Sequence, residues 1–217
     1  MQKQYYSNTN VGETSHDVSK VLRNTYALLG MTILFSALMS VVSIAVNAPY
    51  FGLYSLIPTF ALIFAIEKFK NSPLGIVLAF ALTGWLGFTL GPILSHYVGI
   101  SGIEPVLTAL GGTAMIFFGL SGYILVTKKD MSFATGFIGA GAIVLIVAMI
   151  ANAFLNISAL SLMISCAFLL FSSLVILWQT SAIIHGGERN YVSATVSLYV
   201  SLYNIFTILL SFLGSDD

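Results

Sequence analysis

Apolar residues fill most of the chain in seven long runs, and short polar stretches that hold most of the charges separate them. Most of these runs are close to the roughly 20 apolar residues that a helix needs to cross a bilayer. Strands of a membrane barrel would alternate apolar and polar residues, whereas these runs are continuous. The pattern therefore predicts an all-α integral membrane protein with seven transmembrane helices, over residues 27–46, 51–66, 74–94, 105–126, 133–154, 160–183 and 191–212.

The composition supports lipid as the solvent of this chain. Of its 217 residues, 58% are hydrophobic and 7% are charged, against about 25% charged residues in soluble domains. Basic and acidic residues balance, and no basic cluster is large enough to suggest nucleic acid. Residues 1–19 are polar and too poor in apolar side chains to pack. We expect a disordered tail over residues 1–24, one membrane domain over 25–213 and a short tail over 214–217.

The basic residues predict the orientation. With seven spans, all of them fall on one side, in the N-terminal tail and in alternate connections. They are Lys3, Lys20 and Arg23, then Lys68 and Lys70, then Lys128 and Lys129, and finally Arg189. Because cytoplasmic loops are enriched in Lys and Arg, the N-terminus is expected in the cytoplasm and the C-terminus on the far side. The alternative is a last segment that re-enters without crossing, because the final tail has no basic residue to fix its side.

Small residues predict close approach of helices in two spans. Gly84, Gly87 and Gly91 share one face of the third span, and Gly136 and Ala140 form a small-xxx-small pair in the fifth. Helices in lipid gain packing contacts where small residues let their backbones approach. The alternative is that glycine is simply common in membrane helices.

The last two spans carry the most polar faces. Ser193, Ser197, Ser201 and Asn204 are spaced to share one face of the last helix, while Gln179, Thr180 and Ser181 end the sixth. They form either a polar seam lining a hydrated path or a set of hydrogen bonds between helices. Acidic residues lie at span ends, so a pump built on buried carboxylates is not expected.

No metal site or cofactor is expected. The single cysteine, Cys166, lies in an apolar run, and His96 and His185 fall near opposite sides of the membrane. One motif resembles a catalytic one, because residues 119–122 read G-x-S-G, as in rhomboid proteases. There Ser121 would need His185 as its base. Ser121 lies near the wrong end of its span for such an enzyme, so we expect no catalytic residues and no enzyme.

The C-terminal stretch resembles the signature of the Bax inhibitor-1 family. The resemblance rests on His185, Gly186, Gly187 and Glu188, followed by Tyr191, Ala194 and residues 197–206, which include Tyr199 and Asn204. Residues 20–26, 90–94 and 127–133 are similar to a bacterial branch of this family. The similarity therefore extends over nearly the whole chain, including its loops.

The resemblance implies a bundle with the last helix at its centre, in a bacterial inner membrane, with the C-terminus in the periplasm. For the bacterial branch it implies binding to the membrane-anchored ATP-dependent protease FtsH, as a slowly degraded substrate that restrains it. Other members resemble calcium leak channels with a switch of two aspartates. Gln179 and Ser201 stand at those positions here, and neutral groups attract calcium less strongly than carboxylates. A leak for calcium or another cation without that switch is the alternative function.

Overall fold

The computed structural model describes the backbone of residues 3–214 and the side chains of residues 17–214. Within this range seven helices are long and apolar enough to cross a membrane, which confirms the expected fold class. The second span combines a short 3-10 helix, η1, with α2. The elements are α1 (Lys3–Ala45), η1 (Gly52–Ser55), α2 (Leu56–Phe69), α3 (Pro73–Ser101), α4 (Glu104–Thr127), α5 (Ala134–Leu155), α6 (Ser158–Ile184) and α7 (Tyr191–Gly214).

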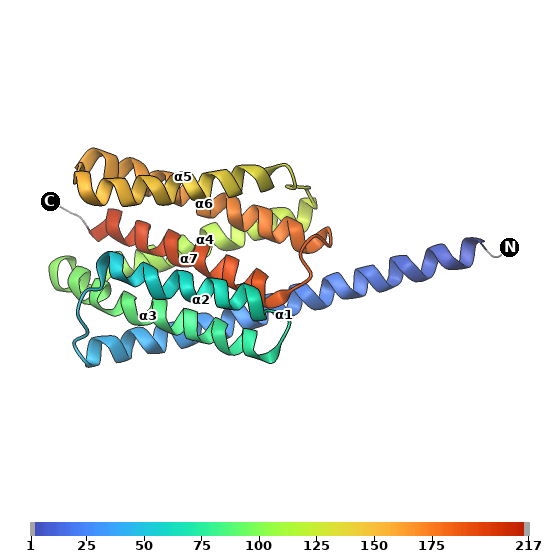
Figure 1. Ribbon diagram of the computed structural model, residues 1–217, viewed down its shortest axis with the longest axis horizontal. Helices are drawn as coiled ribbons and strands as arrows, with labels where there is room; N and C mark the ends of the chain where they lie inside the picture. The colour runs from blue at the N-terminus through green and yellow to red at the C-terminus, as the bar shows by residue number, and fades with distance from the viewer. Residues whose placement is uncertain (1–2, 215–217) are drawn as a thin grey trace.

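The first helix begins earlier than the sequence suggested. α1 starts at Lys3 and continues well beyond the bundle (Figure 1), where we predicted a disordered tail over residues 1–24. The physical reason is that a helix already nucleated in its span extends by one hydrogen bond per residue, whereas starting one is costly. No proline interrupts residues 3–24. At the other end α7 includes Gly214, and residues 215–217 of the predicted second tail lie outside the described residues.

The last helix occupies the centre of the molecule (Figure 1). α7 packs against α1, α2, α3, α4 and α6, as the family resemblance implied. It is one continuous helix of 24 residues, about 36 Å long, which is enough to cross the bilayer rather than re-enter it. α5 packs chiefly on the outer side of α6.

The glycines of α3 lie against α1, as predicted. A Cβ added to Gly87 would stand 2.2 Å from the Ser36 carbonyl oxygen, and one on Gly91 would stand 2.6 Å from the Ser43 side chain. Gly84 is similarly tight against Phe35. Glycine is therefore what lets α1 and α3 pack backbone to backbone.

The prediction for the fifth span was wrong. A Cβ on Gly136 would meet nothing within 4 Å, and Ala140 is exposed. This small-residue pair points away from α6, because the spacing of small residues does not say which face of a helix meets a neighbour.

Candidate functional site

A narrow crevice runs beside the polar face of α7. Its volume is about 260 Å³, and Ser193, Ser197, Ser201 and Asn204 all line it. Three of these side chains are half-buried and Ser201 is buried. The structure therefore places the four α7 members of the predicted polar seam around one space.

The other walls come from α2 and α6. Ile63, Ile66, Phe171 and Val175 are apolar, and Ser172 adds another hydroxyl. Ser172 is 1% exposed, and its Oγ has no hydrogen-bond partner. The sequence analysis did not single out Ser172, because only the rotation of α6 against α7 distinguishes it from other serines in that run.

A carboxylate lies beside the polar face of α7. Glu67, near the end of α2, lines the crevice and accepts a hydrogen bond from Lys70, which raises the pKa of the lysine. The sequence analysis placed Glu67 only at a span end. The i, i+3 spacing of Glu67 and Lys70 was the available signal for the pair.

The remaining predicted seam residues lie elsewhere. The Thr180 hydroxyl is 3.5 Å from that of Ser121 on α4. Ser181 accepts a hydrogen bond from the Met131 amide and donates one to the Lys129 carbonyl, at 2.9 and 3.0 Å. Ser181 thus holds the α4–α5 connection against α6, and neither residue lines the crevice.

The two family switch positions are both buried, but in different surroundings. Ser201 lines the crevice and donates to the Ser197 carbonyl at 2.9 Å. Gln179 lies outside the crevice lining, 2% exposed, and its amide nitrogen has no partner. Neither side chain is an acid, so these positions offer hydrogen bonds rather than a proton to titrate.

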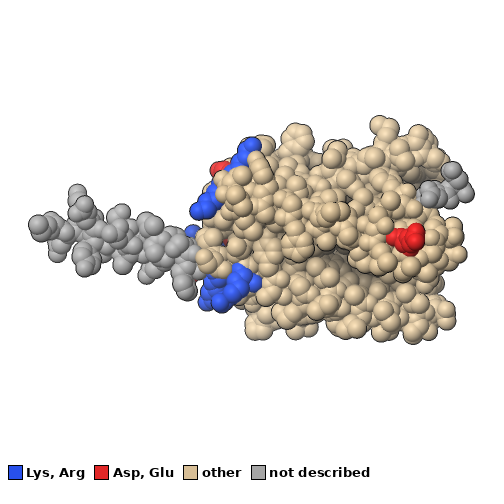
Figure 2. All heavy atoms as spheres, turned by 180° about the vertical axis from the view of Figure 1, so that it is seen from behind, with Lys and Arg blue, Asp and Glu red and all other residues tan. Residues whose placement is uncertain are grey.

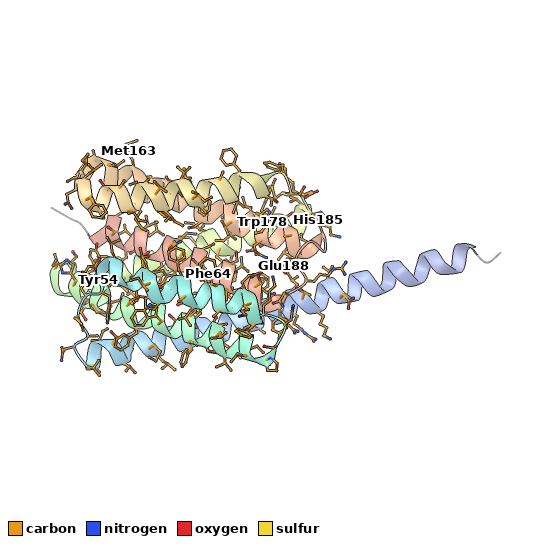
Figure 3. The ribbon with its side chains drawn as sticks, viewed as in Figure 1. Tyr54, Phe64, Met163, Trp178, His185 and Glu188 are labelled. Carbon is orange, nitrogen blue, oxygen red and sulfur yellow. The ribbon has the colours of Figure 1, made fainter. Side chains whose placement is uncertain are left out.

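The signature residues after α6 form the end of that helix. Gly186 has a φ of 73°, a left-handed conformation that glycine adopts without strain. The Gly187 amide then donates to the Ala182 carbonyl at 2.8 Å, which satisfies an open group of the last turn. His185 lies next to this cap, and its Nδ1 is 2.9 Å from the Ser181 carbonyl oxygen. His185 and Glu188 lie at the end of the bundle from which α1 projects (Figure 3).

Tyr199 joins the central helix to two others. It is 4% exposed, and its hydroxyl is hydrogen-bonded to Ser36 on α1 and donates to the Thr83 carbonyl on α3 at 3.3 Å. This signature residue therefore belongs to the packing core of the bundle and lies on a different face of α7 from the crevice.

The geometry does not assemble the hydrolase considered from the sequence. The hydrogen-bond partner of Ser121 is Thr180, and that of His185 is Ser181. Among residues 17–214, no three His, Cys, Asp or Glu side chains gather in a way that could hold a metal ion. The crevice offers hydroxyls, one amide and one carboxylate, a set that can hydrate or bind a polar group.

The chain is similar to proteins of several bacteria. The model of the family described as inhibitor of apoptosis-promoting Bax1 matches residues 18–217. The modulator of FtsH protease YccA of Escherichia coli is 51% identical, over 93% of this chain and 95% of its own. An uncharacterized protein of Pseudomonas aeruginosa is also 51% identical, over 99% and 97%. An uncharacterized membrane protein of Vibrio cholerae is 40% identical, over 96% and 95%.

Proposed function

The chain belongs to the Bax inhibitor-1 family, and on this premise we propose that it is a multi-pass inner-membrane protein that binds and restrains the protease FtsH. The observation that carries the proposal is the similarity to the Escherichia coli modulator of that protease, which covers nearly all of both chains. The names of the relatives above describe a modulator, a membrane protein and an uncharacterized protein, and none of these names describes an enzyme.

The proposed orientation puts the N-terminus in the cytoplasm and the C-terminus in the periplasm. Lys and Arg side chains gather at one end of the molecule (Figure 2), and α1 projects from that same end. Cytoplasmic ends of membrane proteins carry this excess of basic residues. The projecting part of α1 would then lie where an ATP-driven protease can reach it.

Slow degradation follows from two features of α1. Its first turns extend beyond the bundle, and the end of a helix that packs against no neighbour frays easily in water. The rest of α1 packs tightly against the glycines of α3 and against α7. An unfoldase that grips the N-terminus would therefore meet strong resistance after its first steps, and the protease would stay occupied.

Deletion of residues 1–19 tests this proposal. The deletion removes the segment that the protease would grip. It leaves Lys20 and Arg23, which preserve the orientation of the protein in the membrane. The shortened protein should persist longer in cells than the full chain, still co-purify with FtsH from native membranes, and still slow the turnover of its other substrates. A matched control replaces residues 1–19 by an unrelated polar sequence of equal length, which should restore the original half-life. An unchanged half-life together with no association of either form would refute the proposal.

The calcium-leak alternative is the weaker candidate. For a calcium leak the family resemblance implies a switch of two carboxylates, and Gln179 and Ser201 supply none. The structural support for that alternative is limited to the polar surface of the crevice beside α7.

A further inference from the structure

Most polar side chains along the crevice beside α7 lack a hydrogen-bond partner. Within residues 17–214, the side chains of Ser193, Ser197 and Asn204 make no hydrogen bond, although all three are half-buried. Ser172, which lines the crevice from α6, is 1% exposed, and its hydroxyl has no partner either. Buried polar groups without partners are rare in native structures. This set therefore points to a polar group that comes from outside the chain.

Asn204 lies deep in the membrane span. It is about 20 Å along α7, a helix about 36 Å long. Its amide offers two donors and one acceptor. The acyl chains in the middle of a bilayer carry no group that can pair with them, and an unpaired polar group in hydrocarbon is costly. Lipid chains therefore cannot be what satisfies this amide.

The crevice opens toward the membrane between α2 and α6. α7 lies between these two helices (Figure 1), and each of them packs against α7 but not closely against the other. Apolar side chains flank the polar row on both sides, and they are Ile63, Ile66, Phe171, Val175, Val196 and Val200. The volume of about 260 Å³ suits a few side chains rather than a whole helix. A helix that crosses the opening can pack apolar side chains on these walls while one polar side chain reaches Asn204.

We propose that the crevice lined by Ser193, Ser197, Ser201 and Asn204 is the surface that binds a transmembrane helix of FtsH. The inference rests on the proposed function, in which this membrane-anchored protease is the partner. Polar side chains hold helices together in lipid. The matching segment is therefore an apolar helix that carries Ser, Thr, Asn or Gln at the depth of Asn204. The crevice starts at the end of the bundle from which α1 projects, so this contact keeps the protease at the end where it grips the chain.

Co-purification of the full chain with FtsH from native membranes measures the contact. Asn204→Leu removes the amide and nearly keeps the size of the side chain. The amount of FtsH recovered should fall about fivefold, the loss expected for a hydrogen bond between helices. The melting temperature of the purified protein in detergent should stay the same or rise, because the amide has no partner within residues 17–214. A purely structural role for Asn204 would lower the melting temperature instead.

Thr207→Val is the matched control on α7. The Thr207 hydroxyl is half-buried and already donates to the carbonyls of Tyr203 and Asn204, at 2.9 and 3.1 Å. The variant should recover as much FtsH as the unmodified chain. A photocrosslinking test uses a benzophenone amino acid in place of Ile63, which lines the crevice from α2, and it should crosslink to FtsH. The same group in place of Phe137, which is 78% exposed on α5, should not.

Crosslinks to FtsH from position 63 that Asn204→Leu weakens would support the inference. If the full chain recovers FtsH and Asn204→Leu recovers as much, the crevice is not the contact, and the proposed function still stands. The inference is also overturned if position 63 crosslinks only to lipid, or if positions 63 and 137 crosslink to FtsH equally. If the full chain recovers no FtsH, the proposed function itself fails and the inference falls with it.

Discussion

Tyr199 shows how one side chain connects three helices in a solvent that provides no hydrogen bonds. Its ring is buried in the main apolar cluster, and its hydroxyl reaches Ser36 of α1 and the Thr83 carbonyl of α3. In lipid such bonds contribute modestly, about 0.6 kcal/mol on average, because the separated helices also find partners. Two bonds from one hydroxyl make Tyr199 a larger contributor than a surface tyrosine.

Removing that hydroxyl should therefore destabilise the bundle without creating a cavity. Tyr199→Phe is expected to lower the free energy of unfolding by about 1 kcal/mol, because both bonds are lost and the ring remains. Unfolding of the purified protein in a detergent series measures this change. Tyr123→Phe is the control, since Tyr123 is 48% exposed on α4, and it should shift the curve much less. Equal shifts for the two variants would contradict the role given to Tyr199.

The neutral side chains at Gln179 and Ser201 lead to a prediction about pH. Amides and hydroxyls do not titrate between about pH 6 and pH 8. Calcium flux into liposomes should therefore be weak and nearly flat over that range. Gln179→Asp with Ser201→Asp should add a pH dependence, whereas Gln179→Asn with Ser201→Asn, of the same shape, should not. A steep pH response in the unmodified protein would show that titration occurs at another site.

At the scale of elements, the pair of α1 and α3 is the most closely packed part of the bundle. Gly84, Gly87 and Gly91 bring the two backbones together, and serines of α1 lie opposite two of these glycines. Helices without a hydrophobic driving force between them depend on such contacts. This pair is the part that an unfoldase entering from the N-terminus would have to separate first.

Gly87→Ala should disrupt that pair. The new Cβ would lie 2.2 Å from the Ser36 carbonyl oxygen, and a backbone atom cannot move aside without shifting a helix. We expect the free energy of unfolding to fall by about 1–3 kcal/mol, the usual cost of overpacking. Gly119→Ala is the matched control in α4, where the added methyl meets nothing within 4 Å and helix propensity favours alanine. The same unfolding assay compares them, and a stable Gly87→Ala protein would argue against this packing.

At the scale of the whole molecule, the gathering of basic residues at one end is the basis of the proposed orientation (Figure 2). Glu67 and Glu188 accompany the lysines there and influence Lys70, but acidic residues count for little in membrane topology. In the proposed arrangement, seven crossings would put the two termini on opposite sides, and the projecting part of α1 and the end of α7 would meet different compartments.

Cysteine labelling in intact cells tests this orientation. With Cys166 replaced by serine, Gln2→Cys should stay unlabelled by an impermeant reagent that enters only the periplasm, and Ser215→Cys should react. Membrane disruption should make both positions reactive, which controls for buried thiols. Labelling of both ends from the same side would overturn the seven-span arrangement.

The hydropathy of the sequence by itself determined the number of spans and the helical class. This was possible because hydropathy acts along the membrane normal, where each run of apolar residues must satisfy its own backbone. Residues 197–206 and the segment after α6 also carried enough of the family signature to identify the family. The 3.6-residue period placed Ser193, Ser197, Ser201 and Asn204 on one face, and the structure brings them to one crevice.

Only the tertiary structure decided which neighbour each face meets. It placed Ser172 and Glu67 beside the α7 polar face, took Thr180 and Ser181 away from it, and left Gly136 open while Gly87 was enclosed. The rotation of a membrane helix about its axis depends on side-chain fit with several partners at once, since lipid is as apolar as most of the surface it covers. A sequence pattern identifies a face of a helix, and the packing of the seven helices decides what that face contacts.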